Sequence, residues 1–227
     1  MRQRTMAGQE RAAVRRELIV PAGARRLAGD LHVPGTARGL VVFAHGSGSS
    51  RHSPRNRRVA RVLENAGLAT FLLDLLEETE AGDRRLVFDV DLLARRLLAA
   101  TDHLAGLPET GALPVGYFGA STGAAAALIA AARRGPGVHA VVSRGGRPDL
   151  ARAHLDRVEA PTLLIVGGRD VDVLRLNREA LAALCGEKQL VVVPGATHLF
   201  EEPGALEQVA SLALDWFRRH LPAEGTT

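Results

Sequence analysis

The chain has 227 residues, of which 46% are hydrophobic, 24 are glycine and one is cysteine. These values suit one domain with a substantial core and exclude a scaffold held together by disulfides. The formal charge is +4 and the sequence pI is near 10.4. Five arginines against one glutamate give residues 1–16 a net charge of +4, so residues 17–227 are neutral. A neutral body lacks the basic face of a nucleic-acid-binding domain.

The charge distribution divides the chain into three expected parts. We expect residues 1–16 to form a basic, disordered tail, residues 17–221 to form one α/β domain, and residues 222–227 to be a flexible C-terminus. No run approaches the roughly 18 apolar residues of a membrane span, and the start of the chain lacks the apolar stretch of a secretory signal. We therefore expect a cytoplasmic protein that binds neither nucleic acid nor a membrane.

Apolar patterning predicts that strands and helices alternate along the chain. The unbroken apolar run 40–44 is typical of a strand buried on both faces of a parallel sheet. The sequence thus predicts an α/β fold: a mostly parallel central sheet flanked by helices on both faces, with no cap domain. Strands are expected at 17–20, 26–33, 40–44, 69–75, 113–118, 138–143, 162–166 and 190–193, and helices at 54–66, 84–104, 123–133, 172–184 and 204–220. The lone Cys185, at the end of one helical pattern, is expected to be buried.

The pentapeptide Gly119-Ala120-Ser121-Thr122-Gly123 lies between a predicted strand and a predicted alanine-rich helix. A serine on such a sharp turn stands clear of the sheet, and the strained backbone requires small neighbours two residues away on each side. The N–H groups at the start of the helix can then stabilise an anion that forms beside the hydroxyl. The alternative is a glycine-rich turn with an N-capping serine. The flanking strand and helix favour Ser121 as a nucleophile.

A serine hydroxyl needs a base to remove its proton. Of the eight histidines, His198 has the best position, because it follows the last predicted strand at the sheet edge where the Ser121 turn also lies. An imidazole base needs a carboxylate to fix its tautomer, and Asp170 directly follows the strand at 162–166. Asp172 is the alternative, although we expect it to be the N-cap of the next helix. The order serine, aspartate, histidine is the order of α/β-hydrolases.

An oxyanion that forms during attack on a carbonyl group needs two N–H donors. The N–H of Thr122, next to the nucleophile, is the first. The second is expected from the loop His45-Gly46-Ser47-Gly48, whose glycines let the backbone turn inward. We assign it to Ser47, with Gly48 as the alternative. A phosphate-binding turn is a poor alternative for this loop, because it lacks the spacings of a P-loop and of a dinucleotide-binding motif.

Four segments together resemble the α/β-hydrolase superfamily over about residues 17–220, and within it the compact dienelactone-hydrolase-like group: 45–48, 119–123, 167–170 and 194–198. The resemblance implies a fold without a cap and gives the residues named above the same roles. Dienelactone hydrolase itself uses a cysteine nucleophile, whereas this chain has Ser121. The resemblance therefore favours a serine esterase of the same architecture over an enzyme for dienelactone.

Two arginines, Arg144 and Arg147, follow the strand at 138–143 and so lie at the same edge as Ser121. Either could hold a carboxylate or phosphate of the substrate in a bidentate pair. The alternatives are a solvated pair beside a glycine turn and an ion pair with Asp149. The acidic run at 77–80 is expected to be solvated, because no histidine or cysteine lies near it, and we predict no metal site and no cofactor.

The residues together predict a serine-dependent hydrolase that cleaves a small-molecule carboxylic ester or thioester through an acyl-enzyme. An acyltransferase or amidase with the same residues is an alternative, because all share the acyl-enzyme. A non-catalytic protein that binds small molecules on a hydrolase scaffold is another. A third is a protein that binds an acidic partner through its arginine tail. The sequence predicts neither the natural substrate nor the oligomeric state.

Overall fold

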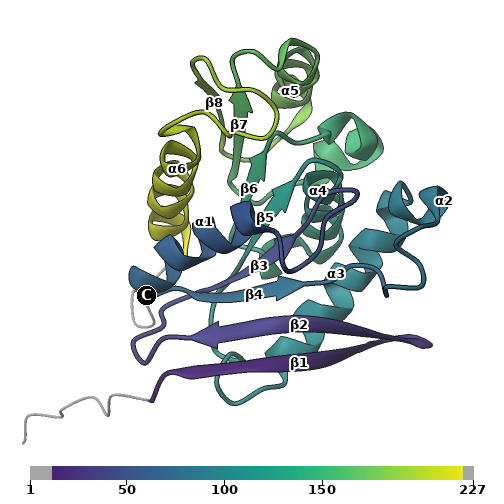
Figure 1. The fold of residues 1–227 in the computed structure, drawn as a ribbon, viewed down its shortest axis with the longest axis vertical. Coiled ribbons are helices and arrows are strands. Elements are labelled where there is room, and N and C mark those ends of the chain that lie inside the picture. Colours follow the sequence, from purple (N-terminus) through teal and green to yellow (C-terminus); the bar gives the residue numbers. More distant parts are fainter. Residues whose placement is uncertain (1–11, 222–227) are drawn as a thin grey trace, which may run out of the picture.

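The structure, a computed structural model, describes residues 12–221 and places eight strands in one twisted sheet (Figure 1). The strands are β1 (Val14–Ala22), β2 (Arg25–Val33), β3 (Leu40–Ala44), β4 (Ala69–Leu73), β5 (Val115–Ala120), β6 (Ala140–Arg144), β7 (Thr162–Gly167) and β8 (Lys188–Val193). Their order across the sheet is β1-β2-β4-β3-β5-β6-β7-β8. β1 pairs antiparallel with β2, and β2 with β4, whereas the other neighbours are parallel. The predicted mostly parallel sheet is confirmed.

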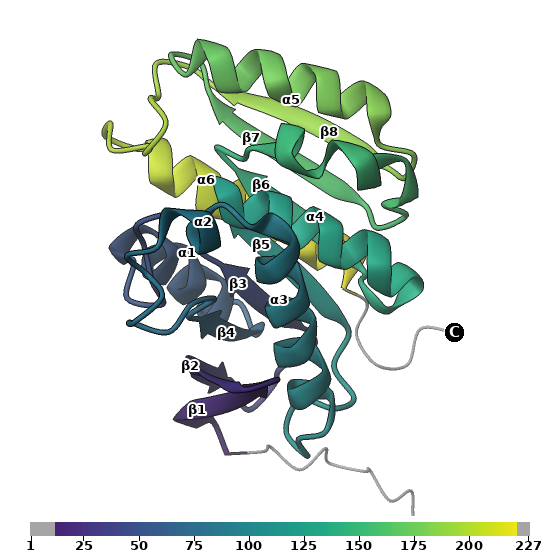
Figure 2. The same cartoon turned by 90° about the vertical axis from the view of Figure 1, so that its right-hand side faces the viewer.

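Helices cover both faces of this sheet. They are α1 (Pro54–Asn65), α2 (Arg84–Val87), α3 (Val90–Ala105), α4 (Thr122–Arg134), α5 (Val171–Ala183) and α6 (Ala205–His220), with 3₁₀ turns η1 (Gly135–Gly137) and η2 (Pro148–Arg157). Figure 2 shows α3, α4 and α5 on one face, while α1 and α6 pack together on the other. Only the short η2 joins β6 to β7, so the described chain has no cap domain there. No helix within residues 12–221 is long and apolar enough to cross a membrane.

Strand β3 shows how the apolar run builds two cores. All five of its residues are buried. Val41 and Phe43 face the layer of α1 and α6, whereas Val42 and Ala44 face the layer of α3 and α4. Side chains alternate between the two faces of a strand, so a strand covered on both faces is apolar throughout.

The first strand begins earlier than the sequence indicated. β1 starts at Val14, so residues 14–16 belong to the sheet and not to the tail. Arg15 pairs with Glu64 at 3.3 Å, and Arg16 pairs with Glu109. These two arginines are therefore balanced by carboxylates of the folded body. Residues 1–11 and 222–227 lie outside the described residues, and the expectations for them stay predictions.

The single helix expected at 84–104 is instead two helices, α2 and α3. The side chain of Asp89 accepts a hydrogen bond from the N–H of Leu92 at 2.8 Å and caps the start of α3. Apolar spacing continues across this break, so the helical period alone did not reveal it. The cap starts a new helix within a continuous apolar pattern.

Two side chains differ in burial from the expectation. Cys185 is exposed, with its Sγ 3.2 Å from the carbonyl oxygen of Val158. Glu80 is only 6% exposed, and Arg96 bonds both of its carboxylate oxygens at 2.7 and 2.8 Å. The acidic run is therefore solvated only in part, because Glu80 has a buried cation as its partner.

Candidate active site

Ser121 lies on a tight turn between β5 and α4. Its φ is +51° and its ψ is −120°, a conformation that residues other than glycine rarely adopt. Its N–H donates to the carbonyl of Arg144 at 3.2 Å, and its own carbonyl accepts from the N–H of Arg147 at 3.1 Å. The loop after β6 therefore holds both peptide groups of the strained residue.

The two glycines of the pentapeptide have no room for a side chain. A Cβ on Gly119 would lie 2.4 Å from the Cα of Ala124, and a Cβ on Gly123 would lie 2.2 Å from the carbonyl oxygen of Ala44. Both distances are far below van der Waals contact. The spacing of the motif thus has a steric cause: strand, turn and helix approach one another at these two positions.

His198 and Asp170 are in direct contact. The Nδ1 of His198 lies 2.6 Å from Oδ2 of Asp170. Asp170 occupies the N-cap position of α5, yet its carboxylate caps no N–H there. Asp172 is exposed in the first turn of α5, so the N-cap role expected for it is wrong. Because Nδ1 is engaged by the carboxylate, Nε2 is the ring nitrogen available for proton transfer.

The loop after β6 also touches His198. Gly145 has a φ of +53°, and a Cβ there would lie 3.2 Å from the carbonyl oxygen and 3.4 Å from Nδ1 of His198. The same loop holds Ser121, so it brings the two residues to one edge of the sheet. The sequence reasoning considered only the arginines of Arg144-Gly145-Gly146-Arg147. Two consecutive glycines directly after a buried strand were the signal for this second role.

The loop after β3 lies against the Ser121 turn. The N–H of Ser47 donates to Oγ1 of Thr122 at 2.9 Å. A Cβ on Gly46 would lie 3.0 Å from the carbonyl oxygen of Ala120. Thr122 is the first residue of α4, so its own N–H has no partner one turn earlier in the helix. The two expected oxyanion donors are thus adjacent, and the N–H of Ser47 is bonded to the Thr122 hydroxyl.

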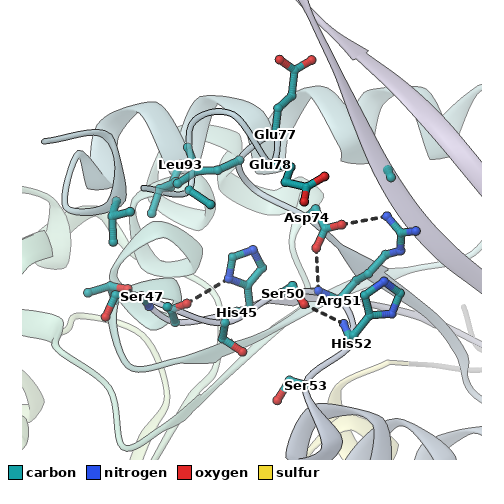
Figure 3. Close-up of a pocket in the computed structure, with 18 of the residues that line it drawn as sticks. His45, Ser47, Ser50, Arg51, His52, Ser53, Asp74, Glu77, Glu78 and Leu93 are labelled. Carbon is teal, nitrogen blue, oxygen red and sulfur yellow. Dashed lines mark hydrogen bonds and ion pairs between the residues drawn. The ribbon is translucent and has the colours of Figure 1, made fainter. Parts of the chain in front are cut away.

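His45 joins this loop to the chain just after β4, and Figure 3 shows the hydrogen bond of its ring within the loop. Its Nε2 accepts from the N–H of Leu75 at 3.0 Å, so the proton lies on Nδ1, which donates to the carbonyl of Gly46 at 2.9 Å. Burial lowers the pKa of His45 below its ordinary value of 6.5. A neutral imidazole with both nitrogens engaged is a structural element and not the base.

A pocket of about 990 Å³ adjoins the loop after β3. Ser47 and Thr122 line it, together with residues 49–55 and the chain that follows β4. Figure 3 shows Arg51 in this pocket, where its N–H and Nη1 bond the carboxylate of Asp74 at 2.6 and 2.7 Å. The sequence reasoning missed these pocket residues, although an arginine-rich segment after the glycine loop was visible. Among residues 12–221, no group of three His, Cys, Asp or Glu side chains could hold a metal ion.

The structure separates the two candidate arginines. Arg147 forms a bidentate pair with Asp149 at 2.8 and 2.7 Å, the ion pair that the sequence left as an alternative. Arg144 is 7% exposed and pairs with no carboxylate of residues 12–221. Burial, and then the charge of Arg55, lower the pKa of Arg144 to about 10. Of the two, only Arg144 has an unbalanced charge.

Comparison with known proteins shows the family of the chain. The model of the dienelactone hydrolase family matches residues 31–221. The chain belongs to this family. A dienelactone hydrolase from Anabaena variabilis is 56% identical, with a TM-score of 0.90 over 92% of this chain and 99% of that one. A serine hydrolase without a lid from Xanthomonas campestris is 22% identical and shares the fold, with a TM-score of 0.75 over 92% and 96% of the two chains.

One curated relative is much longer than this member of the dienelactone hydrolase family. A Mycobacterium tuberculosis protein with the provisional name phosphoribosyl transferase is 64% identical over 209 residues, which are 92% of this chain and 47% of that protein. The chain thus spans about half the length of that relative. Family and fold together make this chain an α/β-hydrolase, and residues 12–221 contain no cap domain.

Proposed function

We propose that this member of the dienelactone hydrolase family is a serine hydrolase that cleaves a carboxylic ester or thioester through an acyl-enzyme on Ser121. The observation that carries the proposal is the 2.6 Å contact between His198 and Asp170, at the sheet edge that also holds the Ser121 turn. The carboxylate keeps Nδ1 protonated and leaves Nε2 to act as a base.

In the proposed reaction, Oγ of Ser121 attacks the carbonyl carbon while Nε2 of His198 takes the hydroxyl proton. The N–H of Thr122 donates to the tetrahedral oxyanion, and the N–H of Ser47 becomes the second donor by exchanging the Thr122 hydroxyl for the oxyanion. The oxyanion collapses and the C–O or C–S bond breaks, and His198 returns its proton to the leaving group. A water molecule then attacks the acyl-enzyme by the same steps, which releases the acid and restores Ser121.

The charge of the chain supports a small-molecule substrate. Residues 17–227 are electrically neutral, which favours neither nucleic acid nor an anionic membrane surface as a partner. The transferase name belongs to a protein about twice as long. We propose no phosphoribosyl transfer for this chain, because a serine–histidine–aspartate set performs acyl transfer.

Hydrolysis of 4-nitrophenyl butyrate and of its thioester analogue tests the proposal. We expect turnover by the wild-type protein and a loss of at least about 1,000-fold in kcat for Ser121→Ala, because no nucleophile remains. Ser211→Ala, an exposed serine on α6, is the matched control and should keep full activity. Activity that survives in Ser121→Ala, or a wild-type protein that hydrolyses neither ester, contradicts the proposal.

A further inference from the structure

Arg144 is a buried cation for which the described chain supplies no counter-charge. It is 7% exposed, no carboxylate of residues 12–221 lies within ion-pair distance, and its Nε is buried without a hydrogen-bond partner. Burial of an unpaired charge is strongly unfavourable. The fold therefore maintains a positive group whose balancing anion must come from outside these residues.

A second arginine lies close to it. Arg55, the second residue of α1, also has an Nε that is buried without a partner. Arg55 bonds Glu201, whose neighbour Phe200 has its ring against the guanidinium of Arg144, so the two arginines lie against the same short segment. Glu201 bonds only Nη1 of Arg55, at 3.0 Å, and its side chain is 64% exposed. One solvated carboxylate thus faces two arginines, and it reaches only one of them.

Arg144 adjoins the Ser121 turn, and Arg55 adjoins the pocket. Ala140 and Val142 of β6 face α1 and α6, so Arg144, two residues further on, faces the same layer. Its guanidinium lies 5.9 Å from the ring centroid of Phe200 in that layer. The carbonyl of Arg144 holds Ser121, and Arg55 lines the pocket that Ser47 and Thr122 also line.

The start of α1 adds to the positive field. Ser53, visible in the pocket in Figure 3, caps the helix by accepting from the N–H of Asn56 at 3.3 Å. The first turn of α1 contains no acidic residue. The positive end of the helix dipole is therefore not offset by a neighbouring carboxylate of its own turn.

We propose that Arg55 and Arg144 together bind an anionic group of the substrate, a carboxylate or a phosphate, at the start of α1. Guanidinium groups bind both anions through paired N–H donors, and among residues 12–221 the two arginines together bond one carboxylate through one nitrogen. The anion supplies the missing counter-charge and places the ester beside Ser121. That the anion belongs to a substrate rests on the proposed hydrolase function, whereas the anion site itself does not.

Thermal unfolding in the presence of sodium phosphate, sodium acetate or sodium chloride at equal ionic strength tests the site. We expect phosphate or acetate to raise the Tm of the full-length protein saturably above the chloride value, and the more effective anion identifies the group. Arg144→Met and Arg55→Met should lose this rise. Arg147→Met, whose side chain already pairs with Asp149, is the matched control and should keep it. Equal Tm in all salts, or a rise that both variants keep, overturns the site.

Ester kinetics test whether the anion belongs to the substrate. Mono-4-nitrophenyl succinate carries a carboxylate in its acyl half and 4-carboxyphenyl butyrate carries one in its alcohol half, while 4-nitrophenyl butyrate is the neutral reference. We expect Arg144→Met to lower the anionic-to-neutral ratio of kcat/KM at least tenfold for one of the two anionic esters, and Arg147→Met to leave both ratios unchanged. Unchanged ratios in Arg144→Met overturn the assignment to a substrate group.

The two proposals fail in different ways. If the wild-type protein hydrolyses none of the esters, the hydrolase function is wrong, while a saturable rise in Tm that Arg144→Met loses still supports an anion site. If the neutral ester is hydrolysed but neither anion raises Tm, the anion site is wrong and the hydrolase stands.

Discussion

Ser121 is half-buried and has a backbone conformation that costs about 1–3 kcal/mol. Such strain persists only where the surroundings enforce it, and here peptide hydrogen bonds to Arg144 and Arg147 do so. The missing side chains of Gly119 and Gly123 let strand and helix approach closely enough to keep the turn. The strained turn places the hydroxyl of Ser121 at the edge of the sheet.

The contact between His198 and Asp170 predicts a difference between two neighbouring aspartates. We expect Asp170→Asn to lower kcat for 4-nitrophenyl butyrate by about 100-fold or more, because the amide no longer holds the imidazole in the required tautomer. Asp172→Asn, exposed on the first turn of α5, should stay within about twofold of wild type, since it leaves that contact intact. Steady-state kinetics measure both kcat values. A larger loss of kcat in Asp172→Asn than in Asp170→Asn would show that Asp172 is the partner of His198.

The hydroxyl of Thr122 leads to a second prediction about a single residue. Its hydroxyl holds the N–H of Ser47 at 2.9 Å, so Thr122→Val should loosen the loop that supplies one oxyanion donor. Loss of one hydrogen bond of this kind corresponds to roughly a 2- to 10-fold fall in kcat. Thr122→Ser keeps the hydroxyl and serves as the control. A valine variant that is as fast as wild type would show that the hydroxyl does not position Ser47.

Sequence reasoning proposed Ser121, Asp170 and His198 as candidates because each lies within a few residues of the end of a recognisable strand. Carboxyl ends of parallel strands share one edge, so topology alone brings these residues near one another. The same reasoning could not separate Arg144 from Arg147. Their difference depends on burial beneath Phe200 and on the ion pair of Arg147, which neither spacing nor composition shows.

At the scale of elements, the segment between β4 and α3 forms one wall of the pocket. Arg96 of α3 reaches this segment and bonds both carboxylate oxygens of Glu80 and the carbonyl of Leu75. The sequence predicted that Glu80 is solvated. Its partner Arg96 lies 16 residues away, and their contact depends on how α3 packs, which spacing does not show. The buried ion pair joins the segment to α3 and thereby shapes the pocket.

Arg96→Met should destabilise the fold by roughly 1.5–3 kcal/mol, because Glu80 loses two charged hydrogen bonds and keeps only the more exposed Arg25 and the N–H of Glu77 as partners. Hydrogen bonds from Arg96 lower the pKa of Glu80 below 4.5, so the stability that the pair supplies above pH 4.5 is lost as pH falls through the lowered value. The variant should show a smaller acid dependence, because the largest cause of the lowered pKa is removed. Urea unfolding at pH 7 and pH 4 measures both effects.

The exposed pair between Arg85 and Asp83 is the matched control for this prediction. The side chain of Arg85 is 91% exposed, so Arg85→Met should leave the urea midpoint at pH 7 unchanged. A similar loss in both variants would show that the Arg96 pair contributes no more than a surface ion pair.

For the whole molecule, the positive charge that the sequence assigned to a tail is partly built into the sheet. Arg15 and Arg16 lie in β1 and pair with carboxylates of the body. Strand boundaries at an exposed sheet edge are hard to predict, because alternate residues there are polar and resemble a loop. The neutral body and the sheet topology were predictable, since both follow from the overall pattern and not from single partners.

Two truncations distinguish the contribution of the tail to thermal stability from that of strand β1. Deletion of residues 1–16 removes the three first residues of β1 and the ion pairs of Arg15 and Arg16, so we expect Tm to fall by about 4 °C. Deletion of residues 1–11 removes no described contact and should leave Tm unchanged. Differential scanning calorimetry measures the Tm of both truncated proteins. Equal Tm values would show that residues 14–16 contribute no stability.

The central claim is that Ser121 is a nucleophile activated by His198. Reaction with a serine-directed fluorophosphonate, followed by mass spectrometry of peptides, locates the modified residue directly. We predict one covalent adduct, on Ser121, that is absent in Ser121→Ala and forms at least about 100-fold more slowly in His198→Ala because the base is lost. A folded wild-type protein that is not labelled, or that is labelled on another serine, would contradict the account.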